Sequence, residues 1–126
     1  MKVKGIGIDI FEKKRMKAAL SRKTSGKILQ KIFSASEIAA FKRSPGKEMF
    51  FSESFALKEA VIKAFGAGWT AYTRFPEVRV KLLGKKIKIV LAGEIREIAK
   101  KKSVKKIVCD YSVSPRHIVA VAVLVG

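Results

Sequence analysis

The stretch EMFFSESFALKEAVIKAF, residues 48–65, decides the fold of this chain of 126 residues. Large apolar side chains recur in it at spacings of four, seven and three, which puts them on one stripe of an α-helix. The stripe consists of Phe51, Phe55, Ile62 and Phe65. Gly66 follows directly, and glycine commonly closes a helix in the left-handed conformation. We therefore expect a long helix with one apolar face against a core.

The segment 3–10 alternates with a period of two, which is typical of a strand. One face carries Ile6, Ile8 and Ile10. The other face carries Gly5, Gly7 and Asp9, so it is nearly bare until it ends in a carboxylate. Glycine inside a strand often marks the close approach of a ligand or of another backbone.

Shorter helical and alternating patterns fill the rest of the chain. Ser34 and Glu37 form a capping box, which marks the start of a helix. The expected helices are residues 12–23, 28–33, 35–43 and 92–102, and the other expected strands are residues 78–82, 87–91, 104–113 and 118–125. The order is a strand, helices, then strands with one inserted helix. This predicts a single α+β domain over residues 1–126, in which a small antiparallel sheet packs against several helices.

The composition is globular and strongly basic. Apolar residues make up 48% of the chain, which excludes a disordered tail. Lysine and arginine number 28 against 10 acids, so the net charge is +18. Such a charge indicates an anionic partner. The candidates are a nucleic acid, an anionic membrane, a phosphate-rich ligand and an acidic protein. A single cysteine, Cys109, excludes an intrachain disulfide and a cysteine-cluster metal site.

No apolar targeting segment is visible at the N-terminus, where Asp9 and glycines interrupt the pattern. The longest unbroken apolar run, residues 118–125, is too short to span a bilayer. We expect a soluble, cytoplasmic protein that has no membrane partner.

Asp9 and the residues around Glu59 are the main candidates for chemistry. Asp9 either caps the helix that follows the strand or provides an oxygen ligand for a hard cation at the strand end. Glu59 and Lys63 are spaced i, i+4, and they form either a solvated helix pair or part of an anion site. Lys58 lies in the middle of the apolar stripe. It either extends its amine to solvent or meets an anion, for which a phosphate is the obvious choice.

Two further groups have polar or basic character. Ser112 and Ser114 share one face of a terminal strand and can donate hydrogen bonds to a phosphate. The helix expected at residues 12–23 carries a basic face, which is either solvated or docks an acidic surface. That face consists of Lys13, Lys14, Arg15 and Lys17. The only histidine, His117, is assigned no catalytic role.

Together these motifs resemble one family. The residues that carry the resemblance are GIGIDI at 5–10 with Glu12 and Arg15, FALKEA at 55–60 with Lys63, and GAG at 66–68. In this order and at this length, they are similar to the small, bacterial-type holo-[acyl-carrier-protein] synthases, which are 4′-phosphopantetheinyl transferases. The sequence departs from the family pattern at Ser54, Lys86 and Pro115, and none of these is a proposed metal ligand.

The resemblance implies an activity and a metal. The family transfers the phosphopantetheine arm of coenzyme A to a serine hydroxyl of apo acyl carrier protein, releases adenosine 3′,5′-bisphosphate and supports fatty acid biosynthesis. It implies that Asp9 and Glu59 hold Mg²⁺, which favours one or two carboxylates together with substrate phosphates and water. Glu59 and Lys63 are then catalytic, with Lys63 on the pyrophosphate. Glu59 or a water on the metal accepts the serine proton.

The resemblance also implies binding surfaces. The expected coenzyme A contacts are Lys58, Lys63, Gly66, Gly68, Ser112 and Ser114. Lys13, Lys14 and Arg15 are expected to dock the acidic carrier protein, and the assembly is expected to be a homotrimer with active sites shared between subunits. The alternatives are a nucleic-acid-binding module, which would explain the +18 charge directly, and an assembly protein that keeps the fold without the activity. No nucleic-acid-binding signature is present, so we expect no nucleic-acid partner.

Overall fold

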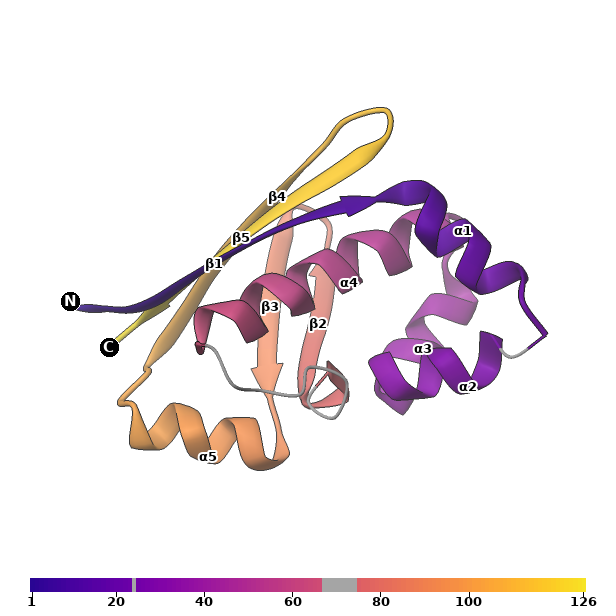
Figure 1. Cartoon of the computed structure of the whole chain (residues 1–126). Helices are drawn as coiled ribbons and strands as arrows, with labels where there is room; N and C mark the ends of the chain where they lie inside the picture. Colours follow the sequence, from indigo (N-terminus) through magenta and orange to yellow (C-terminus); the bar gives the residue numbers. More distant parts are fainter. Residues whose placement is uncertain (24, 67–74) are drawn as a thin grey trace.

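A computed structural model of the chain describes residues 1–23, 25–66 and 75–126. Its helices are α1 (Lys13–Ser21), α2 (Ser25–Ile32), α3 (Ala35–Arg43), α4 (Lys47–Ala64) and α5 (Gly93–Lys101), with a short 3₁₀ helix η2 (Phe75–Glu77). Its strands are β1 (Val3–Glu12), β2 (Val78–Leu83), β3 (Lys86–Leu91), β4 (Lys106–Val113) and β5 (His117–Val125). The helix α4 lies along the long strands, while α1, α2 and α3 gather at one end (Figure 1).

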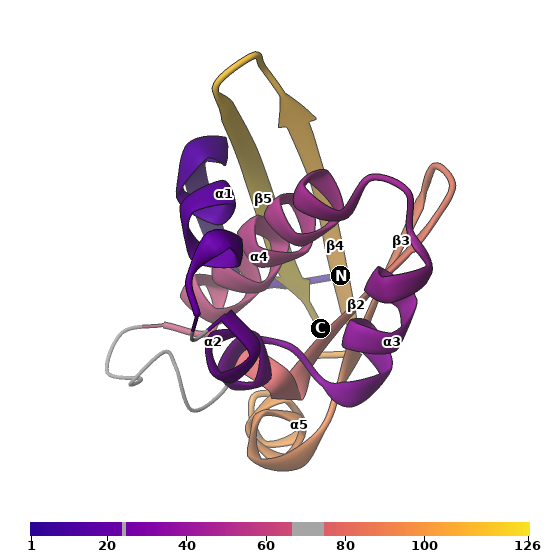
Figure 2. The ribbon, with the colours of Figure 1, turned by 90° about the vertical axis from the view of Figure 1, so that its right-hand side faces the viewer.

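The strands form two antiparallel sheets. The larger has the order β1-β5-β4, and the smaller is the β2–β3 hairpin. In the larger sheet, Asp9 lies opposite Ala120, which lies opposite Tyr111. Figure 2 shows α1 on one side of α4 and the β2–β3 hairpin on the other. The predicted α+β class, with its antiparallel sheet packed against helices and one helix between strands, is confirmed.

The glycine face of β1 lies directly on the backbone of α4. A Cβ atom at Gly5 would overlap the carbonyl oxygen of Ala64, and one at Gly7 would overlap that of Ala60. Glycine in a strand can indicate the approach of a ligand or of another backbone. At Gly5 and Gly7 the neighbour is the backbone of α4. Asp9, on the same face, is therefore held against α4.

The opposite face of β1 is exposed. Ile6, Ile8 and Ile10 have exposed fractions of 60%, 56% and 66%. On β4 and β5, the exposed apolar residues Val108 and Val119 add to this surface. Contiguous apolar surface of this kind marks interaction sites in monomeric folds.

The long helix α4 forms the centre of the core, as its stripe predicts. Of the stripe residues, Phe51, Ile62 and Phe65 are buried, whereas Phe55 is half-buried. The capping box is present at the start of α3, where the Ser34 hydroxyl accepts from the Glu37 amide and the Glu37 carboxylate accepts from the Ser34 amide. Among the described residues, no helix has the length and apolar content that crossing a membrane requires.

Candidate functional site

Asp9 and Lys63 meet where β1 crosses α4. The Lys63 ammonium donates to Asp9 Oδ1 at 3.1 Å and lies 3.4 Å from the Ile8 carbonyl oxygen. The Asp9 side chain is only 11% exposed, whereas that of Lys63 is 52% exposed. Asp9 is not the cap of α1, because that helix begins after Glu12. Of the two roles considered for Asp9, the helix cap is therefore wrong.

The second carboxylate oxygen of Asp9 has no protein partner. Oδ2 is buried and accepts no hydrogen bond from the part of the chain that the structure describes. A buried carboxylate oxygen without a donor is costly, so it is usually explained by a ligand, a water or an ion. A hard divalent cation suits such an oxygen.

Glu59 lies one turn before Lys63 on α4 and faces the same place. Burial raises the pKa of its carboxyl group above the ordinary value, and the neighbouring Asp9 raises this pKa further, against the opposing effect of Lys63 and Arg15. Two carboxylates that disfavour each other's ionisation form a site that a divalent cation can neutralise. The described residues contain no group of three potential metal ligands. Two carboxylates leave the other coordination positions to substrate and water, as Mg²⁺ usually requires.

Lys58 is buried in the core and does not face this site. Its ammonium donates to Glu37 Oε1 at 2.7 Å, to the Phe75 carbonyl at 2.9 Å and to the Val78 carbonyl at 2.6 Å. Glu37 Oε2 in turn accepts from the Val80 amide at 3.0 Å. An ammonium has three protons, so all of them are bound within the protein. Burial lowers the pKa of Lys58 to about 8, although Glu37 counteracts part of this effect.

This arrangement corrects the expectation for Lys58. Its anion is the carboxylate of Glu37 and not a phosphate, and its amine does not extend to solvent. No sequence pattern indicated Glu37 as this partner, because its place in the capping box already explained its presence. The signal that was present is Lys58 on the apolar stripe, which required a buried partner.

The other expected coenzyme A contacts lie at different places. Gly66 ends α4 with a φ of +109°, and its amide donates to the Lys63 carbonyl at 3.1 Å. Gly68 lies outside the described residues. The Ser114 hydroxyl closes the β4–β5 turn by accepting from the His117 amide at 3.1 Å.

Ser112 lies on the sheet face opposite to Asp9. It is paired with Val119, which is paired with Ile10, and residues paired in this way share a face. That face carries the exposed isoleucines, whereas Asp9 shares the α4 side with Tyr111. Within one chain the structure therefore does not bring Ser112 to the carboxylates.

Of the basic residues at the start of α1, Arg15 acts electrostatically on the Glu59 carboxylate. Lys14 pairs with Glu12 at 3.3 Å in an exposed contact, which contributes little stability. The Arg15 guanidinium lies 5.9 Å from the centre of the Phe11 ring. A hollow of about 340 Å³ opens beside it. Its apolar lining includes Phe11, Met16, Ile28, Ile32 and Phe55, and its basic lining consists of Arg15 and Arg22. No sequence pattern indicated this hollow, because its wall combines residues of α1, α2 and α4 that come together only on folding.

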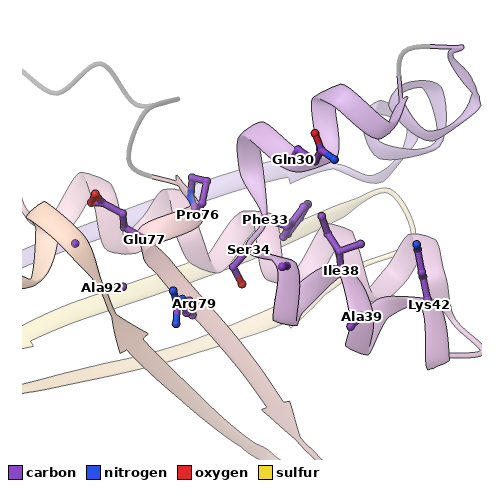
Figure 3. Close-up of a pocket in the computed structure, with 12 residues that line it drawn as sticks. Gln30, Phe33, Ser34, Ile38, Ala39, Lys42, Pro76, Glu77, Arg79 and Ala92 are labelled. Carbon is purple, nitrogen blue, oxygen red and sulfur yellow. The ribbon is translucent and has the colours of Figure 1, made fainter.

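A larger hollow, of about 810 Å³, contains none of the expected site residues. It lies between α2 and α3 on one side and η2, the start of β2 and the start of α5 on the other (Figure 3). Phe33, Ile38 and Ala39 come from one side, and Pro76, Arg79 and Ala92 come from the other. Its lining holds no pair of carboxylates, so the candidate site remains at Asp9 and Glu59.

The chain has clear relatives. A model of the 4′-phosphopantetheinyl transferase superfamily matches residues 5–122. The holo-[acyl-carrier-protein] synthase of Clostridium acetobutylicum is 40% identical over 98 residues, which cover 77% of each chain. The Neisseria meningitidis synthase shares the fold, with a TM-score of 0.88, 20% identity and coverage of 99% of this chain and 100% of that one. The Helicobacter pylori synthase, solved in complex with coenzyme A, has a TM-score of 0.78, 26% identity and coverage of 95% of this chain and 99% of that one. Because the family model covers residues 5–122 and these synthases are similar along the chain, this protein belongs to the 4′-phosphopantetheinyl transferase superfamily and, within it, to the holo-[acyl-carrier-protein] synthases.

Proposed function

We propose that this protein transfers the 4′-phosphopantetheine group of coenzyme A to a serine of apo acyl carrier protein and releases adenosine 3′,5′-bisphosphate. The observation that carries the proposal is the meeting of Asp9 and Glu59, with one Asp9 oxygen buried and without a partner. The Helicobacter pylori relative, which is 26% identical and binds coenzyme A, supports the choice of donor.

Asp9 and Glu59 would hold Mg²⁺. When bound, the ion neutralises charge that develops on the pyrophosphate oxygens during transfer. The buried position of Asp9 supports this role, because its orientation is held by the sheet and by Lys63. Two carboxylates without an ion would repel each other, which agrees with the raised pKa of Glu59.

Lys63 and Glu59 would divide the remaining chemistry. The Lys63 ammonium is half-exposed, so it can leave Asp9 for the pyrophosphate and stabilise the departing phosphate. Glu59 would accept the proton of the serine hydroxyl at its carboxylate. A raised pKa makes this carboxylate a stronger base.

The coenzyme A site would be completed by a second subunit of a homotrimer. Gly66, Gly68 and Lys63 would contact coenzyme A from one subunit, and Ser112 and Ser114 would contact it from the next. The support is that Ser112 shares a sheet face with the exposed isoleucines, and burying such a face favours association. Lys58 is not included, because its ammonium protons are bound to Glu37 and to two carbonyl oxygens.

The carrier protein would dock at α1. Lys13, Lys14 and Arg15 would attract an acidic surface, and the hollow beside Arg15 offers apolar lining for an anchor side chain. As the family resemblance implies, we propose that the modified carrier serves fatty acid biosynthesis in the cytoplasm.

Mass spectrometry of apo carrier protein, incubated with coenzyme A, Mg²⁺ and this enzyme, tests the proposal. We expect the carrier mass to increase by one phosphopantetheine, with an equal amount of adenosine 3′,5′-bisphosphate released. A carrier whose acceptor serine is replaced by alanine serves as control. An unchanged carrier mass, together with tight binding of DNA or RNA, would favour the nucleic-acid-binding alternative.

A further inference from the structure

One edge of the β2–β3 hairpin is partly open. Along an edge strand, backbone groups alternate between the partner strand and the free side. On the free side of β2, the Val78 carbonyl accepts from Lys58 at 2.6 Å and the Val80 amide donates to Glu37 at 3.0 Å. By the same alternation, the Val80 carbonyl and both backbone groups of Leu82 point away from β3. In the described chain no residue is hydrogen-bonded to these groups on that side.

A hollow of about 300 Å³ lies beside this edge, between α3, the start of α4 and β2. Its apolar lining includes Ala40, Phe50 and Leu82. Its cations are Arg43, Arg79 and Lys81, all of them exposed. Among its lining residues the one carboxylate is that of Glu37, which is buried and paired with Lys58. The hollow therefore combines an apolar floor with a basic rim.

The two faces of β2 have different chemistry. Val78, Val80 and Leu82 face the core side, whereas Arg79 and Lys81 are exposed on the other face. Lys81 lies directly opposite Lys88 of β3, and like charges in this position destabilise a sheet. Residues 78–92 contain no acid that could relieve this repulsion. An anionic partner on this face would relieve it.

We propose that the open edge of β2 binds an extended, acidic segment of another protein as a third strand. The segment would alternate apolar and acidic residues. Its apolar side chains would enter the hollow, and its carboxylates would lie beside Arg79 and Lys81. Its backbone would pair with the Val80 carbonyl and with Leu82, which is the mode in which edge strands recruit peptides. The surface is separate from Asp9 and Glu59, so it does not depend on the transfer reaction.

A titration of isotopically labelled protein with acetyl-Val-Glu-Val-Glu-Val-Glu-amide, followed by NMR, tests this proposal. We expect saturable binding with the largest amide shifts at Leu82 and its neighbours, and weaker binding as sodium chloride rises across about 0.05 to 0.5 M. In antiparallel pairing the valine amides bond to Leu82, whereas the glutamate amides face away. N-methylation of the central valine should therefore abolish binding, and N-methylation of the central glutamate should preserve it.

Two charge reversals provide matched protein variants. Lys81→Glu should weaken peptide binding by about tenfold, because its side chain adjoins the added strand. Lys88→Glu makes the same charge change one strand further away, and it should weaken binding by less than about threefold. Absence of saturable binding would overturn the proposal, and the lysines would then only block edge-to-edge association. The proposal would also be overturned if both N-methylated peptides bound equally, or if the largest amide shifts lay away from Leu82. Binding of single-stranded DNA by the same residues, without binding of the peptide, would overturn it as well.

Discussion

Replacement of Lys58 by methionine removes the buried ammonium and keeps a side chain of similar length. The carboxylate of Glu37, with 3% side-chain exposure, then loses its counter-ion and its contact at 2.7 Å. The carbonyl groups of Phe75 and Val78 lose the ammonium as a donor. Removal of one partner of a buried ion pair costs about 3–5 kcal/mol. For a chain of this size we expect the unfolding temperature to fall by about 10 to 25 °C.

Lys63→Met is the matched control, five positions further along the same helix. Its ammonium also contacts a carboxylate, Asp9, at 3.1 Å, but its side chain is 52% exposed. An ion pair with one exposed partner contributes about 1 kcal/mol or less. Urea unfolding at one fixed protein concentration compares the two variants. Equal losses of stability in both variants would refute the structural role of Lys58.

The pH dependence gives an independent check on Lys58. Its pKa is about 8 in the folded protein, against an ordinary value of 10.5. Between these two pH values the unfolded chain holds the proton on Lys58, whereas the folded chain has released it. The contribution of Lys58 to the free energy of unfolding therefore rises with pH. We expect the difference in stability between the wild type and Lys58→Met to widen from about pH 8 to pH 10. A constant difference over this range would show that the amine does not titrate there.

The other predictions concern the carboxylates, the core and the proposed carrier surface. Glu59→Gln should abolish transfer. Without Mg²⁺ it should raise the unfolding temperature at pH 7, because it removes the repulsion between Glu59 and Asp9. Thermal unfolding should show that this gain disappears at acidic pH, where the wild-type carboxyl group is protonated. Ser54→Ala should stabilise the protein by about 1 kcal/mol in urea unfolding, since this buried hydroxyl has no partner among the described residues. Gly7→Ala should destabilise it by about 2–3 kcal/mol in the same measurement, because the added methyl group would meet the backbone of α4. Lys14→Glu combined with Arg15→Glu should raise the KM for apo carrier protein by about tenfold and leave coenzyme A affinity unchanged; an unchanged KM would remove α1 from the docking surface.

Local patterns were sufficient for much of the fold. The capping box at Ser34 marked the start of α3 correctly, because a cap is a contact between residues three positions apart. The period of two in β1 predicted both the strand and the bare face of Gly5 and Gly7. The sequence left open whether a ligand or a backbone approaches those glycines. Only the packing of α4 on the sheet decides this, since it joins segments far apart in the chain.

The difference between local patterns and contacts of distant segments also explains which site residues could be predicted. The spacing of Glu59 and Lys63 placed both on one side of α4, and the structure has both facing Asp9. The partner of Lys58 could not be predicted in this way. Glu37 is 21 residues earlier on α3, and the two side chains meet only because α3 packs beside α4 and β2. A charge on an apolar stripe indicates that a partner exists, but periodicity does not name it.

Lys58 and Glu59 are adjacent, and their opposite surroundings link the core to the proposed metal site. Consecutive residues on a helix point about 100° apart, so one can face the core while the next faces β1. Lys58 is bonded to α3, to η2 and to β2, which restricts rotation of α4 about its own axis. At Gly7 the backbone of β1 contacts the backbone of α4 so closely that no Cβ would fit, and this contact sets the distance between α4 and β1. With rotation and distance both restricted, the position of Glu59 relative to Asp9 is set before any ion or substrate arrives. A site arranged in this way binds without a large cost of ordering, so loss of the Lys58 contacts should weaken Mg²⁺ binding even at temperatures where the variant remains folded.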